Sequence, residues 1–284
     1  MATSATSDQL LVVIDPVARR TDGESVRIAK DVLSAGATTK VCMPEGPEEF
    51  ARVLARRGSR RPVVVGDDRA LLRAVSLLHR QRELAGCALS FVPVGGALSV
   101  ARSLGVPTGA VAAARTVLDG VERRLDLLVD DSDGVVLGAL RIPAPTQQPP
   151  EPALAAVAGA GHPWLRTCQT LVRTLVPARP LREPAPPAPG PSRLRVEVDG
   201  VTLVDLGQPV EAVSVTPGAA GLADVEVRPV SVGAEAAPLR ASGRTVTVTG
   251  ADFRYGADAG VAGPVRRRTW TVWEGALGLT LPGR

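Results

Sequence analysis

Val63–Leu72, with the sequence VVVGDDRALL, decides how the first half of this chain is expected to fold. Its three valines are typical of a strand that is buried on both faces, as in a parallel sheet. A tight turn follows at 66–68, and the apolar residues after it begin the pattern of a helix. A strand that leads through a turn into a helix N-terminus is a place where α/β folds hold phosphate groups. This turn has lost most of the glycines that such a site needs, and it contains Arg69.

Strands and helices alternate on both sides of this stretch. The predicted strands of this region are 10–14, 38–43, 62–65, 88–92, 125–129 and 135–142. The predicted helices are 24–35, 47–57, 68–84, 100–104 and 109–118. Alternation at this pace implies right-handed crossovers and a sheet that is covered on both faces. Residues 8–142 are therefore predicted to form an α/β domain.

The rest of the chain divides where the composition changes. Residues 143–192 are predicted to be a linker with one helix at 164–176, because this stretch holds 13 of the 25 prolines. Beyond it the pattern is all-β, and Asp199-Gly200 is a strong hairpin signal. The predicted strands there are 194–198, 201–205, 210–215, 225–232, 245–249, 269–273 and 276–281. A β-sandwich-like domain is predicted over 193–273, with the tail 274–284 packing back on the α/β domain.

Composition excludes several classes of function. The chain of 284 residues has a net charge of +4 and only 2% aromatic residues, which does not favour nucleic-acid binding. The three cysteines, Cys42, Cys87 and Cys168, are widely spaced, which predicts free thiols in a reducing cytoplasm. The only histidines are His79 and His162, which disfavours a histidine-based triad or zinc site. No signal peptide and no membrane-spanning run is expected.

Several segments together resemble the bacterial diacylglycerol kinase and lipid kinase family, whose N-terminal domain has the NAD kinase-like fold. The sequence GDDRA at 66–70 stands where that family has GGDGT, and PVGGALSVAR at 93–102 stands where it has PLGTGNDFAR. The first strand ends in Asp15-Pro16 in place of Asn-Pro, and DAG at 258–260 takes the place of a DGE motif. The order and spacing of these segments cover nearly the whole chain.

The resemblance implies a site for ATP and Mg²⁺ and the transfer of a phosphoryl group to a lipid hydroxyl such as that of diacylglycerol. It implies two catalytic residues, Asp68 near the phosphoryl group and Asp258 as a carboxylate that accepts the hydroxyl proton. The residues that it places around the nucleotide and phosphates are Asp15, Gly66, Asp67, Arg69, Ala70, Gly95, Gly96 and Ser99.

The phosphate turn departs from this pattern at three positions. Asp67 and Arg69 replace glycines, and Ala70 lacks the hydroxyl of the family's threonine. The Asp67 carboxylate would repel a phosphate. The favoured interpretation is that Arg69 fills the phosphate site and pairs with Asp67 or Asp68. Two alternatives stay open, namely that Arg69 binds a phosphate or that it lies on a solvated turn.

The other two motifs depart as well. Leu98 and Ser99 stand where the family has an Asn-Asp pair that binds the nucleotide, and Leu98 is predicted to be a core contact of a helix. Gly260 stands in place of the family's glutamate. Asp258 either substitutes for that glutamate or is simply a turn residue, and the turn is the favoured interpretation. These departures remove the groups that would recruit Mg²⁺, so no metal site is predicted.

Three hypotheses of function follow. The favoured one is a lipid-kinase-like protein that is catalytically inactive, a pseudokinase with a ligand-binding, regulatory or interaction role. The alternatives are an active ATP-dependent lipid kinase and a scaffold or oligomerisation module, and a homodimer through sheet edges stays open. The basic residues at 56, 57, 60 and 61 and at 266–268 are predicted to be solvated, with peripheral contact to anionic lipid as the alternative.

Overall fold

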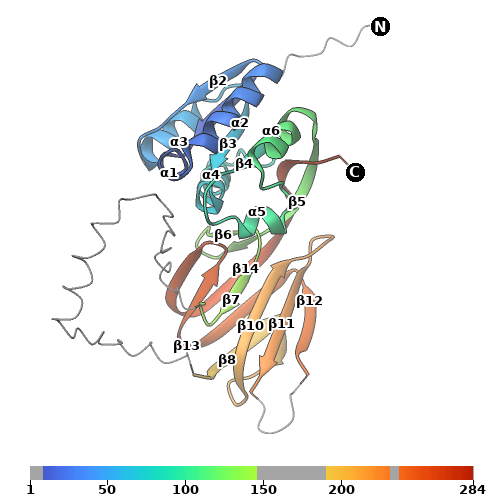
Figure 1. The fold of residues 1–284 in the computed structure, drawn as a ribbon. Coiled ribbons are helices and arrows are strands. Elements are labelled where there is room, and N and C mark those ends of the chain that lie inside the picture. The colour runs from blue at the N-terminus through green and yellow to red at the C-terminus, as the bar shows by residue number, and fades with distance from the viewer. Residues whose placement is uncertain (1–8, 146–189, 231–236, 284) are drawn as a thin grey trace, which may run out of the picture. The chain divides into compact units, whose positions relative to one another are not determined.

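The N-terminal part is built on four parallel strands in the order β4-β3-β1-β2. The structure is a computed structural model, and it describes residues 9–145, 190–230 and 237–283 (Figure 1). The four strands are β1 (Leu10–Ile14), β2 (Thr39–Cys42), β3 (Arg61–Gly66) and β4 (Ala88–Pro93). All residues of β1 are buried, as expected for a strand that is covered on both faces. The four strands predicted from the sequence are confirmed.

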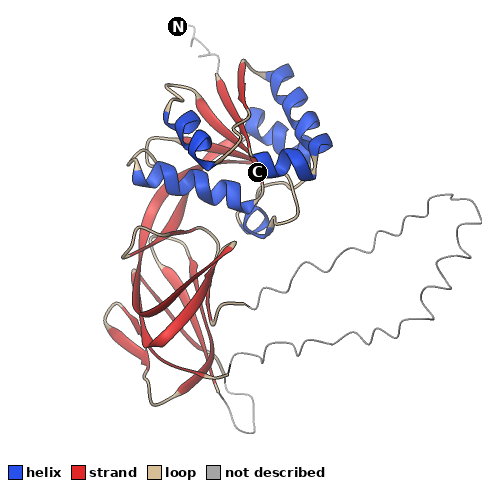
Figure 2. Ribbon diagram, turned by 90° about the vertical axis from the view of Figure 1, so that its left-hand side faces the viewer, coloured by secondary structure: helices blue, strands red, loops and turns tan. Residues whose placement is uncertain are grey.

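Helices cover both faces of this sheet (Figure 2). The helices are α1 (Pro16–Thr21), α2 (Gly23–Gly36), α3 (Pro47–Ala55), α4 (Asp68–Arg80), α5 (Ser99–Ser103) and α6 (Ala110–Asp119). One apolar cluster joins alternate strand residues to α1, α2 and α6, and the other joins the remaining ones to α3, α4 and α5. This arrangement follows from the period of two in strands, because successive side chains point to opposite faces.

The helices differ from the prediction in two places. The short helix α1 was not predicted, although Asp15 caps it by accepting a hydrogen bond from the Val17 amide at 2.9 Å and Pro16 occupies its first turn. Helix α4 was predicted to continue to residue 84 but ends at Arg80. Its end is followed by Arg82 in a left-handed conformation with φ 58°, which a continuing helix does not allow.

The remaining strands are mostly antiparallel. They are β5 (Val121–Asp130), β6 (Val135–Val136), β7 (Leu140–Ile142), β8 (Ser192–Val198), β9 (Val201–Val204), β10 (Pro209–Pro217), β11 (Ala223–Pro229), β12 (Leu239–Gly243), β13 (Thr245–Ala257) and β14 (Gly260–Leu281). Strand β7 pairs with β10 and β13, and β8 pairs with the same two strands, so hydrogen bonding runs in a closed circuit. The side chains of a separate apolar cluster, which includes Trp270, fill this part.

The sequence predicted some of these strands with the wrong extent. The predicted strand 135–142 is interrupted at 137–139, because the amides of these three residues donate to the Asp258 carboxylate. The predicted strands 269–273 and 276–281 belong to one strand, β14, whose pairing with β5 is irregular between Trp273 and Leu277. Strand β12 was not predicted. The hairpin at Asp199-Gly200 is confirmed, with both residues at positive φ.

Strand β14 links the two groups of strands. Its first part pairs with β13, and its last part pairs with β5 and, in parallel, with β4 through Gly278 opposite Ala88. The hydrogen-bonded path therefore continues from the antiparallel strands into the parallel sheet. The predicted helix at 164–176 lies outside the described residues. No helix in the described ranges has the length and apolar character needed to cross a membrane.

Candidate functional site

The candidate site begins at the carboxyl ends of β1, β3 and β4, which lie side by side in the sheet. Gly66 ends β3, and its carbonyl accepts a hydrogen bond from the Val94 amide at 2.7 Å. A Cβ atom on Gly66 would lie 2.6 Å from the Ala70 methyl group, so only glycine fits there. Gly95 has φ +120°, a conformation that favours glycine. The backbone of the predicted phosphate loop is therefore held in place by local packing.

Asp68 is completely buried, and its carboxylate binds the start of α5. One oxygen accepts from the Ser99 hydroxyl at 3.1 Å and from the Val100 amide at 2.8 Å, and the other accepts from the Ala101 amide at 3.0 Å. These are free amides of a helix N-terminus, which a carboxylate satisfies well. The carboxylate predicted to act on a phosphoryl group thus lies inside the protein, bound to its own backbone.

The two substituted residues of the turn have different environments. Asp67 caps α4, and its Oδ1 accepts from the Ala70 amide at 3.1 Å. Arg69 is exposed, and its side chain forms no ion pair or hydrogen bond within the described part of the chain. The expected pairing of Arg69 with Asp67 or Asp68 is therefore not found there, because the two carboxylates bind backbone amides instead. The turn is closer to the solvated alternative.

Asp258 lies in the hairpin between β13 and β14, at φ 49°. Its carboxylate accepts three backbone hydrogen bonds, from the amides of Leu137 at 2.7 Å, Gly138 at 2.7 Å and Ala139 at 3.1 Å. Burial raises the pKa of Asp258, and the negative charge of Asp68 acts in the same direction, while the three amides lower the pKa. This aspartate is thus a turn residue that also fixes the loop between β6 and β7.

A cavity of about 440 Å³ lies beside Asp258, and we call it the cleft. Its lining comes from α5, the loop between β6 and β7, β7 and the residues after it, β10, and the hairpin of β13 and β14. The residues that line it are Ser99, Val100, Ser103, Gly138, Ala139, Arg141, Pro145, Thr216, Gly256 and Asp258. Arg141 is the one basic residue in this set. A cleft of this size can accept a small ligand, and Arg141 and Asp258 are the charged groups that it would meet.

The remaining positions singled out by the motifs do not line the cleft. Leu98 is 9% exposed and belongs to the apolar cluster beneath α4 and α5, which confirms the predicted core contact. Gly96 is exposed, and Gly260 is exposed and follows the Asp258 turn. Ala70 is buried against Gly66. No side chain at these positions supplies the polar groups that the resemblance implies for nucleotide binding.

The carboxylates at the site do not fit Mg²⁺. This ion prefers carboxylate oxygens and water in an open octahedral arrangement. Asp68 and Asp258 each already accept three hydrogen bonds from the protein. Among the described residues, no group of three or more His, Cys, Asp or Glu side chains could hold a metal ion.

Solved structures of similar fold cover nearly the whole chain. One described as a putative diacylglycerol kinase from Bacillus anthracis str. Sterne covers 99% of this chain and 98% of its own, with 13% identity and a TM-score of 0.68. Another with that description covers 96% and 97%, with 12% identity and a TM-score of 0.67. A third, described as a diacylglycerol kinase from the same organism, covers 96% and 97%, with 12% identity and a TM-score of 0.66. This chain has the diacylglycerol kinase fold.

The resemblance drawn from the motifs is thus confirmed for the fold. No model of a known protein family and no curated protein matches the sequence. At 12–13% identity, likeness of structure establishes the diacylglycerol kinase fold alone.

Sequence reasoning missed an ion pair at the edge of the site. The Arg73 guanidinium of α4 donates to the buried Asp15 carboxylate at 2.7 Å and lies 5.6 Å from the centre of the Phe50 ring. Asp15 is 2% exposed, and it caps α1 at the same time. The two residues are 58 positions apart, so no local pattern could have paired them. Asp15 is therefore held by the protein, as Asp68 and Asp258 are.

A second missed cluster supports the diacylglycerol kinase fold beneath the Asp258 hairpin. The Asp130 carboxylate accepts from the Ser132 and Gly134 amides and from the Tyr255 hydroxyl, the last at 3.2 Å. Burial opposes ionisation of Asp130, but the Ser132 hydroxyl, the Gly134 and Ser132 amides and the charge of Arg268 outweigh it and lower the pKa of Asp130. The Tyr255 ring also packs edge-on against Trp270 at 5.2 Å. Strand β13 is thereby fixed three residues before the Asp258 turn.

Proposed function

We propose that this protein is a lipid-kinase-like protein that has lost phosphoryl transfer and has kept the cleft for binding a ligand. One observation carries the proposal: the two carboxylates left at the expected catalytic positions, Asp68 and Asp258, both bind the protein's own backbone. Each carboxylate accepts three N–H or O–H donors of the protein, and a metal ion or a substrate hydroxyl would have to displace at least one of them. The pseudokinase therefore uses these acids to shape the cleft rather than to move a proton.

A second candidate function is an active ATP-dependent lipid kinase. It is favoured by Asp258, which lines the cleft and whose pKa is raised by burial, the direction that suits a general base. In this hypothesis a lipid hydroxyl would have to displace one of the backbone donors from the carboxylate. The solved structures of similar fold that are described as diacylglycerol kinases make this the main competitor.

Phosphoryl transfer is the direct test. The purified chain is incubated with Mg²⁺, labelled ATP and diacylglycerol in mixed micelles, and labelled lipid is measured. We expect no transfer above the background of a sample without protein, and no rise in melting temperature with ATP and Mg²⁺. Lipid phosphorylation that disappears in Asp258→Asn would overturn the proposal in favour of the active kinase.

A stability measurement separates the structural from the catalytic role of Asp258. Asp258→Asn removes an acceptor from the three amides at 137–139, and we expect a loss of about 1–3 kcal/mol in the free energy of unfolding. Asp252→Asn is the matched control, because Asp252 is an exposed residue of β13 at φ 40° whose carboxylate pairs with the exposed Arg266 and with no buried amide of the described residues. We expect a change within about 0.5 kcal/mol for the control. Equal stability of the two variants would contradict the structural role.

Restoring glycines tests whether the turn alone blocks nucleotide binding. In Asp67→Gly with Arg69→Gly the turn regains the glycines of the family motif, while Asp68 and α5 keep their hydrogen bonds. We expect this double variant still to show no ATP-dependent rise in melting temperature, because Leu98 and the bound carboxylates remain. A clear rise would place the loss of function in the turn and weaken the argument from Asp68.

A further inference from the structure

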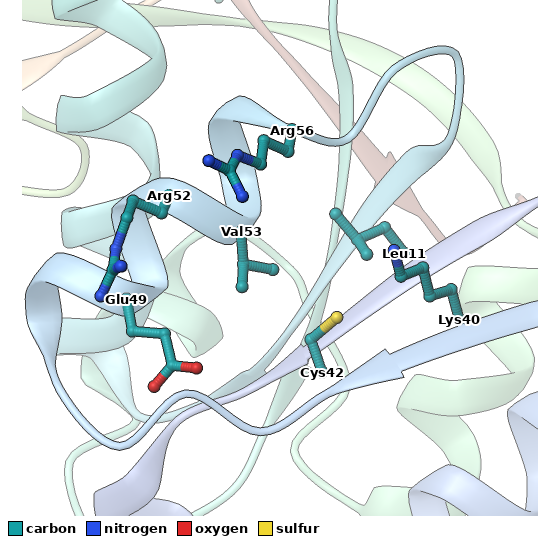
Figure 3. A pocket seen from close by; sticks show the side chains of 7 residues that line it. All are labelled: Leu11, Lys40, Cys42, Glu49, Arg52, Val53 and Arg56. Atoms are coloured by element: carbon teal, nitrogen blue, oxygen red, sulfur yellow. The ribbon is translucent and has the colours of Figure 1, made fainter.

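A small hollow lies between α3 and the edge of the parallel sheet, where β2 is the last strand. Its apolar wall consists of Leu11 of β1, Cys42 of β2 and Val53 of α3, which face one another in Figure 3. The cavity volume is about 230 Å³, which is on the order of eight times the volume that one molecule occupies in liquid water. No lining residue is shared with the cleft.

Three basic side chains line this hollow, namely Lys40, Arg52 and Arg56. None of the three forms an ion pair or a side-chain hydrogen bond within the described residues. Neighbouring arginines differ, because Arg57 pairs with Glu83 and Arg61 donates to the Val117 carbonyl. Arg56 is exposed, as the sequence predicted for the basic run, and it also lines the hollow, whereas Arg57 and Arg61 are half-buried.

The charges of the hollow are not balanced by the protein. Arg52 and Arg56 are one helical turn apart, a spacing at which like charges repel. Glu49 is the single acidic residue in the lining, and its carboxylate accepts a hydrogen bond from the Glu45 amide at 2.8 Å. Three cations against one carboxylate leave two positive charges around an apolar wall. An anion of charge −2 with a short organic group would neutralise them.

We infer that this hollow binds a phosphate monoester. One arginine guanidinium can donate two hydrogen bonds to the oxygens of a single phosphate. Arg52 and Arg56 supply two such groups in the lining, and the Lys40 ammonium on β2 is a further donor. The organic group of the ester lies against Leu11, Cys42 and Val53, which a bare phosphate leaves uncovered. The inference rests on residues that the proposed function does not use, so either can fail alone.

Calorimetric titration at constant ionic strength tests the inference, with inorganic phosphate and ethyl phosphate as probes. We expect ethyl phosphate to bind more tightly than inorganic phosphate. Arg52→Gln with Arg56→Gln is expected to weaken binding by roughly tenfold or more, because two charge-assisted contacts are lost. Glu49→Gln is expected to tighten binding, because it removes the repelling carboxylate.

The matched control is Arg254→Gln with Arg267→Gln, which removes the same charge from two exposed positions of β13 and β14. We expect this pair to bind ethyl phosphate as the unchanged chain does. Equal weakening in both pairs, or no binding of either probe, would overturn the inference. Binding to vesicles that contain phosphatidic acid without binding of ethyl phosphate would overturn it too, because the membrane surface and not the hollow would then be the site.

Discussion

Asp68 keeps its place in a recognisable motif while its oxygens serve a different purpose. The sequence identified the residue, since its turn between a buried strand and a helix is a local pattern. Its partners could not be foreseen, because the Val100 and Ala101 amides lie 32 and 33 positions away. Asp15 and Asp258 repeat the lesson with partners 58 and about 120 positions distant. Position in a motif was thus predictable, and the role of the side chain was not.

Tyr255 offers a test at a single residue, because it is the only tyrosine of the chain. Burial, and secondarily the charge of Asp130, raises the pKa of Tyr255 from its ordinary value of 10.0 to about 12. A group whose pKa is raised by folding stabilises the fold while it is protonated. This contribution is therefore complete below pH 10.0 and is lost as the pH rises toward 12.

Absorbance of the tyrosinate measures this pKa directly. We expect a midpoint near pH 12 in the folded protein and near 10.0 in denaturant. In Tyr255→Phe the alkaline loss of stability over this range should diminish relative to the unchanged chain. A folded-state midpoint at the ordinary value would contradict the buried hydrogen bond to Asp130.

Among the elements, those with strong local signals were predicted and those shaped by distant contacts were not. Strand β1 and the hairpin of β8 and β9 follow from an apolar run and an Asp-Gly turn. The interruption between β6 and β7 depends on Asp258 in another hairpin. Residues of this interruption line the cleft, so the cleft could not be predicted from the sequence for the same reason. Two of its lining residues, Asp258 and Ser99, were predicted as site residues.

Asp126 of β5 is expected to hold two neighbouring elements together. Its carboxylate accepts from the Gly221 amide in the turn between β10 and β11 at 2.8 Å and from the Gly275 amide of β14 at 2.7 Å. Asp126→Ala leaves both amides without this acceptor, and we expect the free energy of unfolding to fall by about 1–3 kcal/mol. Hydrogen exchange should speed up at these two amides first.

The control for this element is Asp119→Ala, at the exposed end of α6. It removes the same side chain where none of the described residues donates a hydrogen bond to it. We expect its stability to stay within about 0.5 kcal/mol of the unchanged chain. Unchanged exchange at Gly221 and Gly275 in Asp126→Ala would show that the two hydrogen bonds carry no stability.

For the whole molecule, the decisive element is β14, because it pairs with β13, β5 and β4. Leu279 is fully buried in the apolar cluster beneath α4, while Trp270 of the same strand is fully buried in the cluster of the antiparallel strands. The sequence indicated that the tail returns to the first part of the chain. It could not indicate that a single strand would enter both clusters.

Leu279→Ala should therefore weaken both groups of strands. We expect a loss of about 2–5 kcal/mol in the free energy of unfolding, since a buried leucine is truncated. Hydrogen exchange should rise in β3 and in β13 together, because β14 joins them. Leu206→Ala, at a position that is 45% exposed, is the control and should leave exchange unchanged. A rise confined to β3 would contradict the coupling through β14.

The late position of β14 in the chain also sets an order of events during synthesis. Residues 10–93 can form their strands and helices early, but the free edge of β4 waits for residues 278–279. A sheet edge without its partner strand can pair with another chain. Nascent copies on one messenger can therefore pair through this edge until residues 278–279 have been synthesised and cover it.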